Sequence, residues 1–212
     1  LKPPFVCLMV SGGHTALLKV NDYTMISLIG STVDDSVGEC FDKVARVLGL
    51  SYPGGPNIDR LAKEGQNTIK FNYHEPLKDT FNFSFSGLKT AVVNFVHNSE
   101  QAGKEFNKAD VAFSFQDIVT DELSEKAVKC TLKENSKTLV VAGGVGANSK
   151  LREKLKEKCE KENITVFFPD LKYCTDNAAM IGSMAYYYLK AGMGLADLTL
   201  TGKPNVPISI GE

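Results

Sequence analysis

Two glycine-rich turns in this sequence could bind a phosphate. Ser11-Gly12-Gly13-His14 lies between two apolar runs, and a glycine pair can leave successive backbone N–H groups free to form a concave anion site. The hydroxyl of Ser11 could add a further donor. A plain hairpin turn explains the same residues equally well, because glycine reaches positive φ without steric cost. This turn therefore leaves two interpretations open.

The second turn, Gly143 to Asn148, lies between a strand-like run and a helical segment. Nucleotides bind at such places because the helix N-terminus carries free N–H groups. The turn resembles the dinucleotide pattern G-x-G-x-x-G, with Ser149 in place of the third glycine and Asp170 at a plausible distance for the ribose contact. The sequence offers no second nucleotide half after it. A nucleotide site of another kind is therefore favoured.

Acidic residues are the next candidates. Asp176 precedes an apolar helical pattern and is expected to be its N-cap, within Thr175-Asp176-Asn177. It could hold a metal only with partners, and the three histidines stand singly, without H-E-x-x-H or H-x-x-x-H spacing. Asp42 falls on the polar side of its helix, where solvent or an intrahelical ion pair is the default partner.

These residues must be positioned by alternating strands and helices. Asp34-Asp35-Ser36 is expected to supply the N-cap of one helix and Ser86 that of another, and Pro56 is expected to open a third. Residues 65–83 are expected to be a loop and 201–212 an irregular arm. The strand–helix–strand–helix order of the last third predicts an α/β protein with parallel strands. The expected strands are 5–10, 15–20, 24–29, 138–142 and 164–168, and the expected helices are 37–48, 56–62, 86–96, 108–134, 148–162 and 178–188.

Composition narrows the function classes. The 212 residues hold 24 Lys and Arg against 25 Asp and Glu, so any polyanion must bind through a local patch. With 43% hydrophobic and 23% charged residues the chain is not disordered. No apolar run approaches the roughly 20 residues of a membrane span. Five cysteines without a C-x-x-C pair favour reduced thiols and a cytoplasmic protein. The start at Leu1 indicates a piece of something longer.

Six short motifs occur in a specific order, and together they carry a resemblance that none carries alone. This series resembles the TsaD family, the tRNA N6-adenosine threonylcarbamoyltransferases, formerly labelled O-sialoglycoprotein endopeptidases, over nearly the whole chain. The motifs are Val10-Ser11-Gly12-Gly13-His14-Thr15, residues 34–43 (DDSVGECFDK), Tyr52-Pro53-Gly54-Gly55-Pro56, residues 83–90 (FSFSGLKT), residues 143–148 (GGVGAN) and Thr175-Asp176-Asn177-Ala178-Ala179-Met180.

The resemblance implies an α/β fold of the actin-like, Hsp70-like ATPase type, with a mixed sheet flanked by helices in each ribonuclease-H-like lobe. Residues 1–212 would form the C-terminal lobe, with a helical middle segment at about 86–134 and without the N-terminal lobe. The implied activity moves threonylcarbamoyl from threonylcarbamoyl-adenylate to N6 of the adenosine beside the anticodon. The implied partners are tRNA, a paralogous scaffold subunit and an associated ATPase, in the cytoplasm and away from membranes.

The resemblance also implies roles for ten residues. The phosphate side of the adenylate would lie against Met9, Val10, Ser11, Gly12 and Gly13. The ribose or the threonylcarbamoyl portion would contact Asp42 and Gly55, with Asp59 nearby, and Asn148 would face the adenine. Asp176 would ligate a divalent metal, iron or zinc, whose other ligands are an H-x-x-x-H pair in the N-terminal lobe. The resemblance implies that this chain forms one half of the cleft and is inactive alone. No residue is assigned a catalytic role.

Two other functions are compatible with the same residues. A non-catalytic scaffold subunit of the same complex would keep the fold, although it has no need for Asp42, Asn148 and Asp176. A metallo-glycopeptidase would fit the old family label, but no zinc-protease motif supports it.

Overall fold

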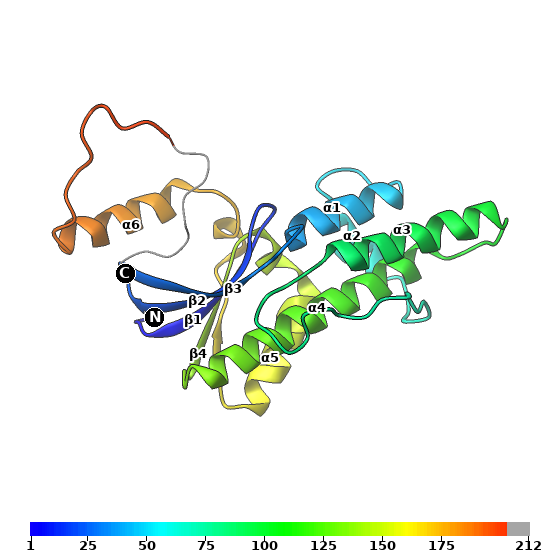
Figure 1. Cartoon of the computed structure of the whole chain (residues 1–212), viewed down its shortest axis with the longest axis horizontal. Coiled ribbons are helices and arrows are strands. Elements are labelled where there is room, and N and C mark those ends of the chain that lie inside the picture. The colour runs from blue at the N-terminus through cyan, green and yellow to red at the C-terminus, as the bar shows by residue number, and fades with distance from the viewer. Residues whose placement is uncertain (203–212) are drawn as a thin grey trace.

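A five-stranded mixed sheet forms the centre of the chain in the computed structural model, which describes residues 1–202 (Figure 1). The strand order is β3-β2-β1-β4-β5. Strands β1 (Phe5–Val10), β2 (Thr15–Asp22) and β3 (Met25–Ser31) form an antiparallel meander. β4 (Thr138–Ala142) pairs in parallel with β1, and β5 (Thr165–Phe167) pairs in parallel with β4. The mixed sheet confirms the expected one.

Six α-helices accompany the sheet in the described part of the chain. The helical middle segment expected at 86–134 is present as two helices, and the irregular arm expected at 201–212 falls mostly outside the described residues. The helices are α1 (Val37–Val47), α2 (Gly54–Ala62), α3 (Ser86–Gln101), α4 (Lys108–Lys133), α5 (Ser149–Lys161) and α6 (Ala178–Lys190), with 3-10 turns at Gly144–Ala147 and Leu171–Tyr173.

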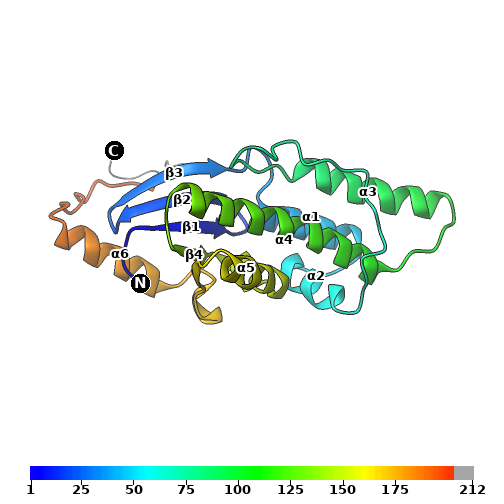
Figure 2. The same ribbon diagram turned by 90° about the horizontal axis from the view of Figure 1, so that it is seen from below.

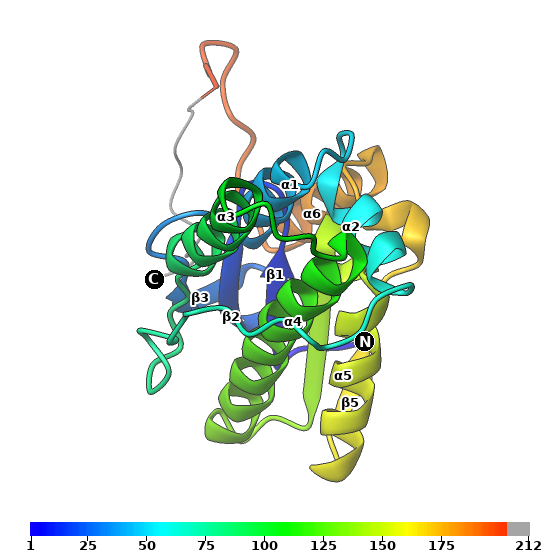
Figure 3. The same ribbon diagram turned by 90° about the vertical axis from the view of Figure 1, so that its right-hand side faces the viewer.

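The main core lies between one face of the sheet and the helices α1, α4 and α5. Figures 2 and 3 show α4 crossing this face with α5 beside it. Leu8 of β1, Phe115 of α4 and Leu155 of α5 are fully buried there. Since each such side chain stabilises the fold by about 1.5–3 kcal/mol, this packing fixes the helices that carry the candidate site residues.

The opposite face of the sheet has its own smaller cluster, which includes Phe5, Cys7 and Leu18. α6 lies on this side of the sheet (Figure 1). Tyr187 of α6 stacks on Tyr23, with ring centroids 3.9 Å apart. None of the described α6 residues is buried. In residues 1–202, no helix has both the length and the apolar character to cross a membrane.

Helix N-termini are capped partly as expected and partly across long distances. Ser36 caps α1 by accepting from the N–H of Glu39, as the sequence predicts. The cap predicted for Ser86 is wrong, and within the predicted Thr175-Asp176-Asn177 the capping residue is Asn177 and not Asp176. α3 is instead held by Asp34, whose carboxylate accepts the N–H groups of residues 85 and 86 at 2.8 and 3.3 Å. Asn177 caps α6 because its side chain accepts from the N–H of residue 180.

The segment 65–83 is irregular, as expected, but a buried lysine ties it to α4. Lys126, whose side chain is 4% exposed, pairs with Glu75 at 2.6 Å and with Glu122 at 3.3 Å. It also donates to the carbonyl oxygens of Leu77 and Asn82. Burial raises the pKa of Glu122 to about 7, because desolvation and the nearby Glu75 outweigh the attraction of Lys126.

Candidate functional site

The first glycine turn closes on itself through Ser11. Its N–H donates to the carbonyl of His14 at 2.8 Å, and its hydroxyl oxygen accepts the N–H groups of His14 and Gly13 at 3.0 and 3.3 Å. The N–H of Gly13 is therefore not free, and the expectation of successive uncovered N–H groups is wrong for this residue. Neither Gly12 nor Gly13 has a positive φ, and a Cβ on either would meet no atom within 4 Å. Neither backbone strain nor packing in the described chain demands glycine there.

The start of α1 is docked against this turn. The N–H of Gly38 donates to the carbonyl of Ser11 at 3.2 Å, and the hydroxyl of Ser36 donates to the carbonyl of Gly12. A Cβ on Gly38 would lie 2.6 Å from the Ser11 oxygen. Here glycine is required by close packing, because only a residue without Cβ lets the helix approach the turn.

The second glycine turn lies against the first because β1 and β4 are parallel neighbours. Gly143 has φ +95 and ψ 167, a conformation open essentially to glycine alone. A Cβ there would collide with the carbonyl oxygen of Val10. The carboxyl ends of the two strands thus bring both glycine turns to one edge of the sheet, as expected for a ligand site in an α/β fold.

Asn148 and Asp59 meet at the start of α5. The Oδ1 of Asn148 caps this helix by accepting the N–H of Leu151 at 3.0 Å, and its Nδ2 donates to Oε1 of Gln116 on α4 at 2.9 Å. Asp59 on α2 accepts from the N–H and the hydroxyl of Ser149 at 3.3 and 2.8 Å. Both residues predicted to bind substrate therefore also hold α5 in place.

Asp42 links α1 to α2. Its Oδ1 accepts the N–H of Gly54 at 2.6 Å, and a Cβ on Gly54 would lie 2.6 Å from the Cα of Asp42. A solvated or intrahelical partner for Asp42 is thus the wrong expectation. The same bond explains why α2 begins at Gly54, two residues before the predicted Pro56.

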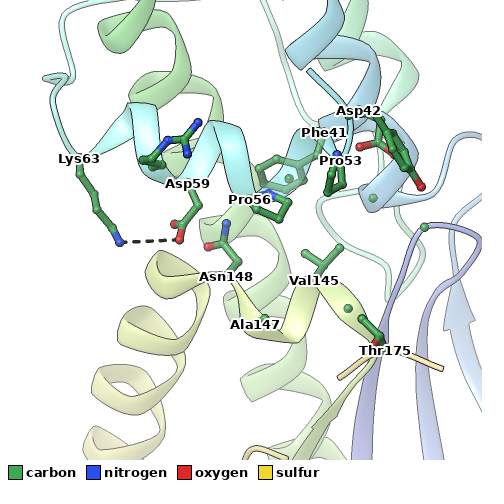
Figure 4. A pocket seen from close by; sticks show the side chains of 16 residues that line it. Phe41, Asp42, Pro53, Pro56, Asp59, Lys63, Val145, Ala147, Asn148 and Thr175 are labelled. Carbon is green, nitrogen blue, oxygen red and sulfur yellow. Dashed lines mark ion pairs between the residues drawn. The ribbon is translucent and has the colours of Figure 1, made fainter. Parts of the chain in front are cut away.

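A cavity of about 460 Å³ lies between α1, α2 and the two glycine turns (Figure 4). This volume is in the range of small-molecule sites. Figure 4 shows Asp42 at one side of the cavity and the ion pair of Asp59 and Lys63, with 4.0 Å between N and O, at the other. The lining residues are Gly12, Gly38, Phe41, Asp42, Tyr52, Pro53, Gly55, Pro56, Asp59, Arg60, Lys63, Gly144, Val145, Ala147, Asn148 and Thr175.

A second cavity, of about 860 Å³, adjoins the first and shares Gly12, Tyr52, Gly144 and Thr175 with it. Eight of the ten predicted site residues line one cavity or both. The two exceptions are Val10, which is buried in β1, and Gly13. The predicted residues that line the second cavity are Met9, Ser11, Gly12 and Asp176.

The metal assignment of Asp176 can be tested against its surroundings. Asp176 is exposed at the second cavity. Residues 1–202 contain no group of three or more His, Cys, Asp or Glu side chains that could hold a metal ion. Asp176 thus belongs to no such group, and the described residues do not form a complete metal site by themselves.

Several lining residues are absent from the predicted set. Lys63 could have been found from its i,i+4 spacing to Asp59 on one helix. Tyr52 and Thr175 stand within the motifs that carry the family resemblance. Gln116, which lines neither cavity but bonds to Asn148, gives no signal in the sequence, because it lies on another helix, 32 residues before that partner.

Solved structures support the fold class. Full-length HypF in its phosphate- and nucleotide-bound form aligns with a TM-score of 0.69 at 14% identity, covering 91% of this chain and 34% of that one. HypF of T. kodakarensis aligns with a TM-score of 0.67 at 13% identity, covering 89% of this chain and 34% of that one. With the mixed five-stranded sheet, these likenesses define an α/β protein of the ribonuclease-H-like, actin-like type.

Sequence comparison specifies the family. Residues 1–183 match the family model described as TsaD, tRNA N6-adenosine threonylcarbamoyltransferase. The transferase of that name from Clostridium perfringens (strain ATCC 13124) is 51% identical over 210 residues, 97% of this chain and 61% of the relative. The transferase of Clostridium botulinum (strain 657) is 49% identical over 213 residues, which cover 98% of this chain and 61% of the relative. The chain belongs to the TsaD family and spans about three fifths of these curated relatives.

Proposed function

We propose that this chain is the nucleotide-binding lobe of a tRNA N6-adenosine threonylcarbamoyltransferase. The whole protein would move threonylcarbamoyl from its adenylate to N6 of the adenosine next to the anticodon. The observation that carries the proposal is the cavity of about 460 Å³ beside both glycine turns, where Gly12 and Gly55 face open space. The relatives with this name, about half identical to the chain, supply the reaction.

Each predicted ligand would act through atoms that the fold leaves available. Met9, Val10, Ser11, Gly12 and Gly13 would lie along the phosphate side. The N–H groups of Ser11 and Gly13 already donate within the turn, so the N–H of Gly12 would be the turn's donor to the departing AMP. The Nδ2 of Asn148 carries two hydrogens and its Oδ1 two lone pairs. Since the structure uses one of each, the second hydrogen and the second lone pair could contact adenine.

The part of the cavity away from the phosphate side would bind the ribose or the threonylcarbamoyl portion. Asp42 and Gly55 would contact that portion, and Asp59 lines the same cavity on the side away from Asp42. Asp42 accepts the N–H of Gly54 through Oδ1, so Oδ2 is the oxygen open to a ligand hydroxyl. The proposed contribution of this lobe is geometric: it fixes the adenylate carbonyl for attack by the weakly nucleophilic adenosine amine.

A divalent metal, iron or zinc, is proposed for the whole protein, with Asp176 as one ligand. When bound, it would polarise the carbonyl as a Lewis acid. The described residues do not complete its coordination, so the steps above use only groups of this chain. The proposed partners are tRNA, a paralogous scaffold subunit and an associated ATPase. The five free, buried cysteines support a reducing compartment such as the cytoplasm.

A scaffold subunit is the second candidate, and one observation favours it. Asp42 and Asn148 have structural bonds of their own, so their presence does not by itself indicate catalysis. The open faces of Gly12 and Gly55 favour the transferase instead, because no contact in the described chain requires glycine at either position.

Transfer of labelled threonylcarbamoyl from its adenylate to tRNA tests the proposal. This chain and the full-length gene product are assayed side by side, with partner subunits supplied. Activity of the full-length product alone would support both the transferase and the need for a second lobe. Activity of neither would favour the scaffold, and release of peptides from a glycoprotein substrate by the purified protein would favour the peptidase.

A further inference from the structure

Two segments of the site follow neighbouring strands and are linked by one arginine. The second glycine turn follows β4, and the segment 168–176, which ends at Asp176, follows β5. Arg152, in the first turns of α5, donates from Nε to the carbonyl of Gly146 at 2.7 Å. Its Nη2 donates to the carbonyl of Pro169 at 3.0 Å. One guanidinium thus bonds both to the glycine turn after β4 and to the chain after β5.

The same guanidinium contacts two further side chains of the second segment. Its central carbon lies 4.9 Å from the ring centroid of Phe168, and its Nη2 lies 3.7 Å from the Sγ of Cys174. Cys174 is 4% exposed and stands two residues before Asp176. Arg152 therefore packs directly against the segment that leads into the proposed metal ligand.

The second segment is joined to the sheet through few backbone pairs. β5 is three residues long, and it pairs with β4 only over those residues. Beyond it, Pro169 has no N–H to donate, and the N–H groups of Tyr173 and Cys174 donate locally, to residues 170 and 171. The side chain of Arg152 thus provides bonds that the local backbone does not.

We propose that Arg152 is a positioning residue for the threonylcarbamoyl transfer proposed above: it holds the glycine turn at the adenine side and the segment carrying Asp176 in one fixed relation. This inference rests on the proposed function for its catalytic consequence. Its structural part, the restraint of the segment 168–176, stands on the contacts of Arg152 alone.

The geometry requires an arginine. A guanidinium is planar, with five N–H donors, and can bond two carbonyls while stacking on an aromatic ring. A lysine offers a compact ammonium with three N–H donors, which could bond a carbonyl but lacks the planar fork and the flat face that stacks on Phe168. Lysine at position 152 should therefore restrain the segment only in part.

The test uses the full-length protein with its partner subunits and three variants, Arg152→Met, Arg152→Lys and the control Lys156→Met, which changes an exposed residue of α5. Alkylation of Cys174 by iodoacetamide, followed by peptide mass spectrometry, reports release of the segment. Alkylation of Cys159, fully buried on α5, reports opening of the helix itself. The kcat and KM of transfer to tRNA are measured on the same samples.

We expect Arg152→Met to raise the alkylation rate of Cys174 about tenfold or more while Cys159 stays protected. It should lower kcat about 10- to 100-fold, as expected when a reacting group is misplaced by about 1 Å. Arg152→Lys should fall between wild type and Arg152→Met, and Lys156→Met should match wild type.

Equal acceleration of Cys174 and Cys159 would overturn the proposal, because it indicates general destabilisation. An unchanged Cys174 rate or an unchanged kcat would overturn it as well. If wild type itself transfers nothing, the proposed function fails, and the catalytic role of Arg152 fails with it. The two cysteine rates then still decide whether Arg152 restrains the segment.

Discussion

Substitution of Gly12 by alanine separates ligand binding from stability. A Cβ on Gly12 would have no atom within 4 Å, and its φ is not positive. The free energy of unfolding should therefore stay unchanged or rise by about 0.4–1 kcal/mol, since alanine restricts the unfolded chain. If a nucleotide packs on this backbone, the added methyl group overlaps it. Such overpacking costs about 1–3 kcal/mol, which corresponds to about a 5- to 150-fold weaker affinity.

Gly143→Ala is the matched contrast from the other glycine turn. Its backbone conformation is strained for any residue with a Cβ, which costs about 1–3 kcal/mol. The collision with the carbonyl of Val10 adds about 1–3 kcal/mol, because backbone must shift. Gly143→Ala should thus lower the free energy of unfolding by about 2–6 kcal/mol, the sum of these two costs.

The assay pairs urea unfolding with titration of AMP, used as the probe for the adenylate, on full-length protein and both variants. The reasoning predicts weaker AMP binding without lost stability for Gly12→Ala, and lost stability for Gly143→Ala. If Gly12→Ala binds AMP within about twofold of wild type, against at least about fivefold expected, the first glycine turn does not contact the nucleotide.

Three further substitutions test the framework of the site. Asp42→Ala should cost about 1–2 kcal/mol in urea unfolding, because the N–H of Gly54 loses its acceptor, whereas Asp42→Asn keeps one. Lys154→Met should cost about 2–3 kcal/mol in the same assay, because this largely buried ammonium pairs at 2.6 and 2.8 Å with two carboxylates of α4. The pKa of Glu122 is raised to about 7. As the pH rises from 4.5 to 7, the free energy of unfolding of wild type should therefore fall relative to that of Glu122→Gln, by up to about 1.4 kcal/mol per pH unit.

The sign of the Glu122 effect follows from its proton. Between pH 4.5 and 7 the folded state keeps the proton and the unfolded state has lost it, so raising the pH favours unfolding. A stability difference from Glu122→Gln that does not vary with pH would contradict this.

Lys161→Met, at a side chain 67% exposed, is the control for Lys154→Met and should change the free energy of unfolding by less than about 0.5 kcal/mol. Equal losses in Asp42→Ala and Asp42→Asn would show that the acceptor is not what matters.

Tertiary structure gave several predicted residues a second role. Asp59 and Asn148 were expected as substrate contacts, yet both hold the start of α5 through bonds to Ser149, Leu151 and Gln116. The bond between Asp59 and Ser149 spans 90 residues of sequence. No periodicity or spacing could indicate it, because it depends on α2 and α5 being packed around the same helix, α4.

The sequence by itself determined the local structure. Strands and helices lie within a few residues of their predicted bounds, and Ser36 caps its helix as expected, because hydrophobic period and capping depend on neighbours along the chain. Only the tertiary structure decided which glycines are required, that Asp34 rather than Ser86 accepts N–H groups at the start of α3, and that Arg152 joins two segments of the site. The requirement for glycine at 143 depends on the parallel pairing of β1 with β4, and the bonds of Arg152 depend on that of β4 with β5. Such long-range contacts leave no periodic pattern in the residues that make them.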